Sequence, residues 1–316
     1  MKKITTRIFV LVILAIICMP KSYSQNKLSG QISISGAFAL YPMTVKWAEE
    51  FRKINPDVRI DISAGGAGKG IADALGGMVE IGMVSREIYP EEIKKGAFPV
   101  AVTKDAVVAV VSELNPAINE IVTKGLKKDA GNNIWITGRC TSWAQAFDIK
   151  SSSPMHVYTR SDACGAAEMW AKYFGKKQED LLGVGVFGDP GLAQAVKKDP
   201  LGMGFNNIGY AYDAQTKKQV KGLRVVPIDL NNNGKIDDDE NFYNSMNDLI
   251  AAIASGKYPS PPARELYFVC KGNPKNNKVL TEFIKWVLSD GQKFVHEAGY
   301  IALPKEKILS ETKKLE

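Results

Sequence analysis

Short apolar runs alternate with amphipathic helical patterns along most of this chain, and this alternation constrains its fold more than any other feature. The run DAVVAVVSE (105–113) is almost continuously apolar, as in a strand buried on both faces of a sheet. The segment PMTVKWAEEFRKI (42–54) instead repeats apolar residues at helical spacing after Pro42. Chains in which strands and helices take turns fold as α/β proteins. We therefore expect parallel sheets wrapped by helices, with ligand-binding loops at the carboxyl ends of the strands.

The same patterns locate the other elements. The predicted strands are residues 31–36, 57–63, 80–85, 105–113, 155–160, 184–188, 203–212 and 223–228, and the predicted helices include 42–54, 242–256 and 279–299. No internal repeat or low-complexity linker interrupts this order.

The amino terminus has the form of a secretory signal peptide. Three basic residues among the first seven precede an apolar run over 8–17, and Ser24 offers a small residue for cleavage. The run is too short to span a bilayer. We therefore interpret residues 1–24 as a signal peptide and expect an exported protein. A lipid anchor at Cys18 is the alternative, although the bulky isoleucines directly before it do not suit that modification.

Removal of this leader leaves an almost neutral chain. The full chain carries 41 basic and 34 acidic residues, and four of the basic ones lie within residues 1–24. The mature balance is therefore 37 against 34, or +3. So small an excess does not indicate nucleic-acid binding.

Four glycines stand between residues 65 and 70 in the segment SAGGAGKGIADAL (63–75). The segment lacks the first glycine and the hydroxyl of a P-loop, and Ile71 stands where a dinucleotide-binding fingerprint needs its last glycine. What remains is a glycine-rich turn from strand to helix, whose unpaired N–H groups can bind a small anion. A tight turn that binds nothing is the alternative.

The segment DLNNNGKIDDDE (229–240) matches the calcium-binding loop of EF-hands at every diagnostic position. The predicted Ca²⁺ ligands are Asp229, Asn231, Asn233, the carbonyl of Lys235, Asp237 and Glu240. Gly234 supplies the sharp turn. A predicted strand precedes the loop instead of a helix, so we expect a single structural site with a dissociation constant of about 10⁻⁴–10⁻³ M. An acidic turn without calcium is the alternative.

A further set of signals is spread over seven segments of the chain. They are SGAFALYPMTVKWAEEF (35–51), SAGGAGKGI (63–71), EIGMVSREI (80–88), DAVVAVVSELNP (105–116), YTRSDACGAAEMW (158–170), GMGFNNIGYAY (202–212) and KYPSPPARELYFVCKG (257–272). In this order they resemble the phosphate-type (PstS-like) periplasmic solute-binding proteins of ABC transporters.

The resemblance implies an α/β, two-lobed type II periplasmic-binding-protein fold, with a hinge between the lobes and the ligand in the cleft. We expect lobe 1 to comprise residues 25–111 and 215–316, and lobe 2 to comprise residues 112–214. One crossing between the lobes should lie near Val107–Val111.

The resemblance also implies a set of binding residues. Loops of this family offer backbone N–H groups and hydroxyls to an anion, and by position Arg160 is the arginine that pairs with its charge and Asp162 the acid that braces it. The candidate ligand-binding residues are Ala37, Phe38, Ala67, Gly68, Ser85, Arg86, Arg160, Asp162, Cys164, Gly165 and Ala166. We expect a periplasmic monomer that delivers a small anion, phosphate first, to an ABC permease.

Five hydroxyl groups that the family loops carry are absent here. Loops that usually read Gly-Ser-Thr, Gly-Ser-Gly and Ser-Gly-Thr read GAF (36–38), GAG (66–68) and CGA (164–166) in this chain. Each lost donor to a buried anion should cost on the order of 1–3 kcal/mol. We therefore expect weak phosphate binding in a smaller, more apolar cleft. A diverged protein with another ligand or none, acting as an envelope scaffold, is the alternative.

Enzymatic activity is a further alternative. Cys164, at a predicted helix start in the cleft, could act as a nucleophile. The chain has only two histidines, His156 on a predicted strand and His296 in the last predicted long helix, and neither is an evident base. With Cys140 and Cys270, Cys164 makes an odd number of cysteines after the leader, which is not a complete disulfide framework. We expect a binding protein.

Overall fold

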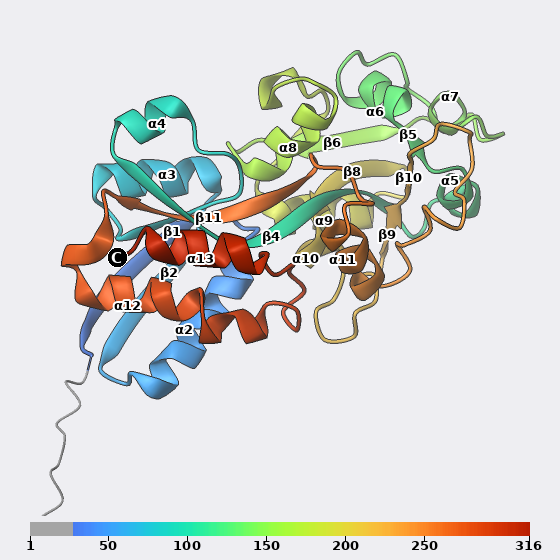
Figure 1. Cartoon of the computed structure of the whole chain (residues 1–316). Coiled ribbons are helices and arrows are strands. Elements are labelled where there is room, and N and C mark those ends of the chain that lie inside the picture. Colours follow the sequence, from blue (N-terminus) through green and yellow to red (C-terminus); the bar gives the residue numbers. More distant parts are fainter. Residues whose placement is uncertain (1–27) are drawn as a thin grey trace, which may run out of the picture.

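The computed structural model describes residues 28–316, so the predicted signal peptide (1–24) and Cys18 lie outside the described residues. Within that range, no helix is both long and apolar enough to cross a membrane. The chain forms two lobes, and two strands, β4 (Ala97–Ser112) and β11 (Ala263–Lys271), lie where the lobes join (Figure 1).

Lobe 1 is built on strands β2, β1, β3, β11 and the first part of β4, in that spatial order. Its first three strands are parallel, because a helix connects each of them to the next. Besides β4 and β11, its elements are β1 (Gly30–Gly36), α2 (Tyr41–Ile54), β2 (Val58–Ala64), α3 (Ala67–Gly76), β3 (Ile81–Val84), α4 (Pro90–Lys94), α12 (Lys278–Val287) and α13 (Lys305–Lys313). Helix α2 packs Trp47 and Phe51 into the lobe core, where Phe51 contacts Phe283 of α12 edge to face.

Lobe 2 is built on the second part of β4 with strands β8, β6 and β7, and β9 pairs with the other edge of β4. Its elements are α5 (Ile118–Lys124), β5 (Leu126–Lys127), α6 (Lys128–Trp135), α7 (Trp143–Phe147), β6 (His156–Arg160), α8 (Gly165–Tyr173), β7 (Val184–Val186), α9 (Gly188–Lys198), β8 (Gly202–Asn207), α10 (Ile208–Ala211), β9 (Leu223–Val226), β10 (Ile228–Asp229) and α11 (Met246–Ala254).

Strand β4 joins the lobes by changing partners part-way along. Its residues up to Ala106 pair with β11, whereas those from Val107 onward pair with β8 and β9. The strands are hydrogen-bonded in one continuous order. The change of partners along β4 divides that order into the strands of lobe 1 and the strands of lobe 2. The predicted crossing near Val107–Val111 lies at the change of partners.

The return crossing differs from the expected boundary at residue 215. Strand β9 pairs with residues 109–112 of β4, and α11 packs on the same side of that strand as Val108 and Val110. Residues 223–254 therefore belong to lobe 2, because their apolar side chains complete its core. The chain returns to lobe 1 only at Ala263, where β11 begins.

Strand β4 is buried on both faces in lobe 2, as its apolar run predicts. Val107, Ala109 and Val111 contribute to one core cluster, while the alternate residues Val108 and Val110 contribute to the cluster on the opposite face. This alternation is the two-residue period of a strand.

The sheet is mixed, which corrects the expectation of purely parallel sheets. Strand β4 pairs antiparallel with β11, β8 and β9. The predicted helix 279–299 is also wrong beyond Val287, where α12 ends and a 3₁₀ turn follows over Asp290–Phe294. In that turn the carbonyl of Gly291 accepts a hydrogen bond of 2.8 Å from the Trp47 indole, so a tertiary contact replaces the helical ladder.

Candidate functional site

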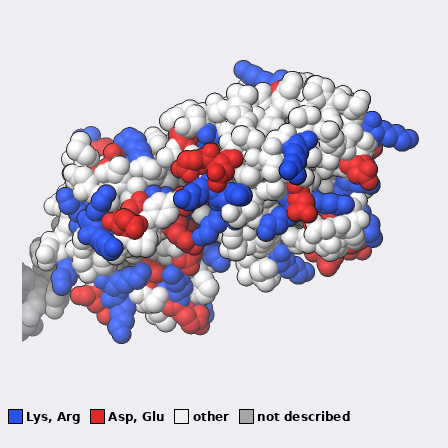
Figure 2. Space-filling model, turned by 90° about the horizontal axis from the view of Figure 1, so that it is seen from above, with Lys and Arg blue, Asp and Glu red and all other residues white. Residues whose placement is uncertain are grey.

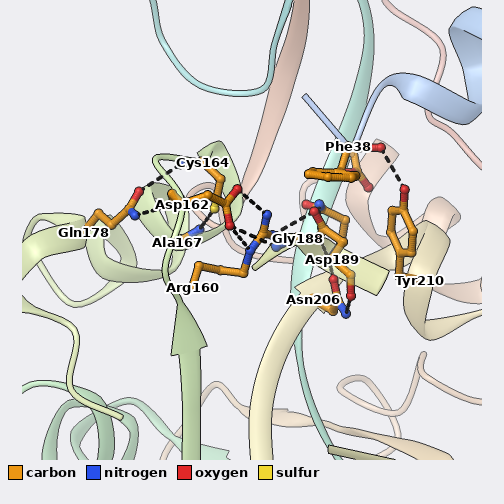
Figure 3. Close-up of polar contacts among 12 residues, drawn as sticks. Phe38, Arg160, Asp162, Cys164, Ala167, Gln178, Gly188, Asp189, Asn206 and Tyr210 are labelled. Carbon is orange, nitrogen blue, oxygen red and sulfur yellow. Dashed lines mark hydrogen bonds and ion pairs between the residues drawn. The ribbon is translucent and has the colours of Figure 1, made fainter. Parts of the chain in front are cut away.

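Loops from both lobes meet at Arg160, the last residue of β6 (Figure 3). Its side chain is 1% exposed and faces two carboxylates. Nε and Nη2 donate to Asp162 at 2.9 and 2.7 Å, and Nη1 donates to Asp189 at 2.7 Å. Arg160 is therefore a buried cation with two anionic partners, and not a solvated surface charge.

The charges around Arg160 do not cancel. Burial lowers the pKa of Arg160, but the negative charge of Asp189 and the contacts with Asp162 outweigh burial and raise that pKa above its usual value. One guanidinium between two carboxylates leaves the three side chains with an excess negative charge. The cleft thus already contains counter-ions for its arginine.

Sequence reasoning missed Asp189. It lies in the first turn of α9, where the side-chain amide of Asn207 donates to its carboxylate and that of Asn206 donates to its carbonyl at 2.9 Å. A signal was present, since GDPG (188–191) places an acid directly after a predicted strand. Such positions hold ligand-binding side chains in α/β proteins.

The ring of Phe38 lies over Arg160 and narrows the cleft. Its centroid is 5.8 Å from the guanidinium carbon, and it meets Phe187 edge to face with centroids 5.9 Å apart. Gly188, with φ +73°, lies against the ring, and a Cβ there would come within 3.1 Å of it. The hydroxyl of Tyr210 donates to the carbonyl of Phe38 at 3.2 Å. An apolar ring therefore occupies the place where the resemblance leads us to expect a hydroxyl.

The glycine-rich loops let the two lobes touch. The N–H of Gly68 in lobe 1 donates to the carbonyl of Ala163 in lobe 2 at 3.0 Å. A Cβ on Gly165 would lie only 2.0 Å from the carbonyl oxygen of Ser85, so no other residue fits there without a shift. The N–H of Ala37 is also used, by a carbonyl of β3 at 2.9 Å. Two of the N–H groups that were expected to bind an anion are therefore already used in hydrogen bonds to backbone carbonyls.

Cys164 caps the start of helix α8, because its Sγ accepts from the N–H of Ala167 at 3.4 Å. Burial raises the pKa of the Cys164 thiol to about 12, so the thiol stays protonated at neutral pH and is not an activated nucleophile. The N–H groups of Gly165 and Ala166 in the same turn make no hydrogen bond within residues 28–316. They remain able to bind an anion at the positive end of the helix.

Arg86 bridges the lobes. Its guanidinium makes two hydrogen bonds, of 2.9 and 2.7 Å, to Glu92 in lobe 1, and its Nε lies 3.3 Å from Glu168 in lobe 2. Burial lowers the pKa of Arg86, but the bonds to Glu92 outweigh this and raise it overall. Beside it, Glu87 of lobe 1 pairs with Lys172 of lobe 2 at 2.8 Å. Two ion pairs therefore connect the lobes.

A cavity of about 690 Å³ opens beside these ion pairs. Gly68 and Arg86 line it from lobe 1, and Lys176, Lys177 and Gln178 line it from lobe 2. Acidic and basic side chains are interspersed over the face of the molecule seen from above, including its middle (Figure 2). The surface charge seen there is mixed.

Comparison with known proteins identifies the family. The profile of the PBP superfamily domain matches residues 21–291. The chain belongs to the PBP superfamily. Protein SphX of Synechococcus elongatus is 26% identical over 290 residues, covering 90% of this chain and 80% of that protein. The phosphate-binding protein PstS of Staphylococcus saprophyticus is 25% identical over 300 residues, covering 92% and 86%. The resemblance to PstS-like proteins is confirmed.

Solved structures of two bacterial proteins share this fold. A Clostridium perfringens structure described as a phosphate ABC transporter substrate-binding protein with bound phosphate aligns with a TM-score of 0.69 at 23% identity, covering 87% of this chain and 100% of that one. An ABC-type phosphate transport receptor from Vibrio cholerae aligns with a TM-score of 0.62 at 20% identity, covering 86% and 100%. The predicted type II α/β fold is confirmed.

In this PBP-superfamily chain, the predicted calcium loop lies between β10 and α11 in lobe 2. The carboxylate of Asp229 accepts from the N–H groups of Asn233 at 3.2 Å and Gly234 at 2.7 Å, and Gly234 has φ +83°. The carboxylate of Glu240 accepts from the N–H groups of Leu230 at 2.8 Å and Asn231 at 3.1 Å. The first and last predicted ligands are therefore buried inside the loop.

The loop is docked on a neighbouring segment of lobe 2. The N–H of Ile236 donates to the carbonyl of Thr123 at 2.9 Å, and β10 pairs with β5. Among residues 28–316, no three His, Cys, Asp or Glu side chains are gathered as a ready metal site. The predicted ligands instead bind N–H and amide groups of their own loop, and calcium binding stays a prediction.

Proposed function

We propose that this protein is an exported solute-binding protein that captures a small anion between its lobes, with inorganic phosphate as the first candidate, for an ABC importer. The observation that carries the proposal is the buried Arg160 at the point where the loops of both lobes converge. A curated relative named as a phosphate-binding protein aligns over 86% of its own length. A periplasmic location, an inner-membrane permease as partner and a monomeric state belong to the same proposal.

The chain retains several donors for such an anion. Three of the five guanidinium N–H groups of Arg160 are engaged with Asp162 and Asp189, which leaves two for a ligand. The first N–H groups of α8, at Gly165 and Ala166, directly follow Cys164 and the loop that contains Asp162. Guanidinium and helix N-terminus are both groups that bind oxyanions.

A cleft that has diverged to another ligand or to none is the second candidate. It is favoured by the contacts that already fill the site, namely the two carboxylates on Arg160 and the ring of Phe38 above it. In that case the protein would act as a binding or scaffold protein of the cell envelope.

Calorimetry separates these functions. Refolded, ligand-free protein is titrated with phosphate, sulfate, molybdate and glycerol 3-phosphate. A phosphate dissociation constant near or below about 1 μM, equivalent to about −8 kcal/mol, would support transport. Arg160→Lys, which keeps the charge but loses the fork of donors, should weaken binding at least about tenfold. Arg139→Lys, at an exposed position outside the cleft, is the matched control. If no anion gives a heat of binding or changes the Tm of the protein, the result would favour the role as an envelope scaffold.

We also propose that residues 229–240 bind one structural Ca²⁺. The oxygen-rich ligand set and the turn at Gly234 support this, since Ca²⁺ takes carboxylate and carbonyl oxygens at these loop positions. Asp229, Asn231, Asn233, Asp237 and Glu240 would bind through their side chains and Lys235 through its carbonyl. Binding requires these side chains to turn from loop N–H groups to the ion.

A further inference from the structure

The carboxylate of Asp189 is a fixed part of lobe 2. Its side chain is 2% exposed, and it lies between Nη1 of Arg160 and the side-chain amide of Asn207. Both neighbours come from strands of the same lobe, β6 and β8. Opening or closing of the cleft therefore does not by itself move Asp189 away from Arg160.

A single carboxylate would be enough to orient Arg160. Asp162 already binds Nε and Nη2 side by side, which sets the plane of the guanidinium. Asp162 is itself held, because the N–H of Gly188 donates to it at 3.0 Å. Asp189 adds a second negative charge without being needed for that orientation.

An anion that reaches Arg160 must then bind next to a carboxylate that cannot withdraw. Arg160 and Asp162 together are neutral, so Asp189 makes the site negative before any ligand arrives. Like charges a few ångströms apart repel strongly when both are shielded from water, and the repulsion doubles for a dianion. Two other buried cations lie near the cleft, and both have acidic partners. Arg86 is balanced by Glu92 and Glu168, and Arg264, which donates to Asn207, is paired with Asp105.

We propose that Asp189 is the specificity-determining residue of this cleft, a built-in counter-anion that competes with the ligand for Arg160 and disfavours dianions relative to monoanions. The inference rests on the proposed function, because it assumes that anions bind at Arg160. This role of Asp189 also predicts the direction in which its removal changes the affinity for anions. If Asp189 only positioned Arg160, its removal would weaken binding, whereas removal of a competing charge strengthens it.

The test is calorimetry at one pH on wild-type protein and on Asp189→Asn, which keeps the shape of the side chain and its ability to accept from Asn207. The ligands are sulfate, phosphate at an alkaline pH where it is mostly the dianion, and hypophosphite, a tetrahedral monoanion. We expect Asp189→Asn to bind sulfate and phosphate at least about tenfold more tightly, with a smaller gain for hypophosphite. The control is Glu120→Gln, which makes the same change in net charge at an exposed position of α5 and should leave all three constants unchanged.

The outcomes separate this inference from the proposed function. If both proteins bind phosphate with equal constants, or the variant binds more weakly, the role of Asp189 is overturned and phosphate binding stands. If only the variant binds, the role of Asp189 is supported and phosphate is not the ligand of the natural protein. An equal gain for monoanion and dianions overturns the charge selectivity. Binding by neither protein overturns both proposals.

Discussion

At the scale of single residues, the close approach of the two lobes decides which side chains are tolerated. Gly165 is the clearest case, because the space that a Cβ would need is already taken by the backbone and hydroxyl of Ser85 in the other lobe. Its role is therefore steric and concerns the contact between lobes.

Gly165→Ala should force the lobes apart or distort the start of α8. We expect a loss of about 1–3 kcal/mol in the free energy of unfolding, the usual cost of overpacking. The measurement is urea denaturation. Gly209→Ala is the matched control, since a Cβ on Gly209 in α10 meets no atom within 4 Å. Equal stability of the two variants would contradict the close contact.

Asp105 predicts a pH dependence of stability. It is buried beside Arg264, whose Nη2 lies 3.4 Å from its carboxylate, and burial raises the pKa of Asp105 to about 7. The unfolded chain has an Asp pKa of about 3.9, so between about pH 4 and 7 the folded protein holds a proton that the unfolded chain releases. The contribution of Asp105 to the free energy of unfolding should therefore fall as the pH rises, by up to about 1.4 kcal/mol per pH unit.

Asp105→Asn should flatten that fall, because the amide does not titrate. Urea denaturation at several pH values between 4 and 7 measures the slope, and Glu120→Gln should keep the wild-type slope. An unchanged slope in Asp105→Asn would show that the carboxyl of Asp105 titrates normally in the folded protein.

At the scale of elements, the loop between β10 and α11 is the part of lobe 2 that a cation could stabilise. Glu240, its last predicted ligand, is buried at 3% exposure, whereas its neighbour Asp239 is exposed. The two acids therefore offer a paired experiment within one loop.

Calcium should raise the Tm of the wild-type protein. With a dissociation constant of about 10⁻⁴ M, Ca²⁺ at one hundred times that concentration should stabilise the fold by about 2.7 kcal/mol. Glu240→Gln should abolish the increase, and Asp239→Asn should retain it. Differential scanning calorimetry with and without Ca²⁺ decides this, and a wild-type Tm that does not respond to millimolar Ca²⁺ rules the site out.

At the scale of the whole molecule, the lobes contact each other directly around the cleft. The hydrogen bond from Gly68 to Ala163 and the ion pairs of Arg86 with Glu168 and of Glu87 with Lys172 all cross the interface. The closed arrangement therefore has its own stabilising contacts, independent of any ligand.

Removing both acids of the ion pairs should open the cleft. The double variant Glu87→Gln with Glu168→Gln should show a larger radius of gyration than the wild-type protein by small-angle X-ray scattering. Loss of the exposed pair of Glu87 and Lys172 should change its free energy of unfolding by no more than about 1 kcal/mol, whereas loss of Glu168 beside the buried Arg86 should cost more. The control is Glu120→Gln with Asp129→Asn, two exposed positions in lobe 2 that do not line the cavity beside the ion pairs. Identical scattering from all three proteins would mean that the ion pairs do not hold the lobes together.

Sequence reasoning recovered the elements because their signals are local. Helix α2 lies within one residue of its predicted bounds, since burial and backbone preference act over neighbouring residues. Strand β4 ends within one residue of its predicted end but begins at Ala97, eight residues before the predicted start. The resemblance of the seven segments likewise led to the correct family and fold. The predicted helix ran past the end of α12, where the carbonyl of Gly291 accepts a hydrogen bond from Trp47, far away in the sequence.

The sequence by itself determined the positions of elements such as β1, α2 and β2, that strand ends carry the candidate site, and that Arg160 and Asp162 share one loop. Only the tertiary structure decided that Asp189 pairs with Arg160, that β4 changes partners at Val107, and that the N–H of Gly68 meets the other lobe. The reason is physical. Local patterns report burial and backbone preference, whereas an ion pair or a contact between lobes depends on which strands the fold places side by side.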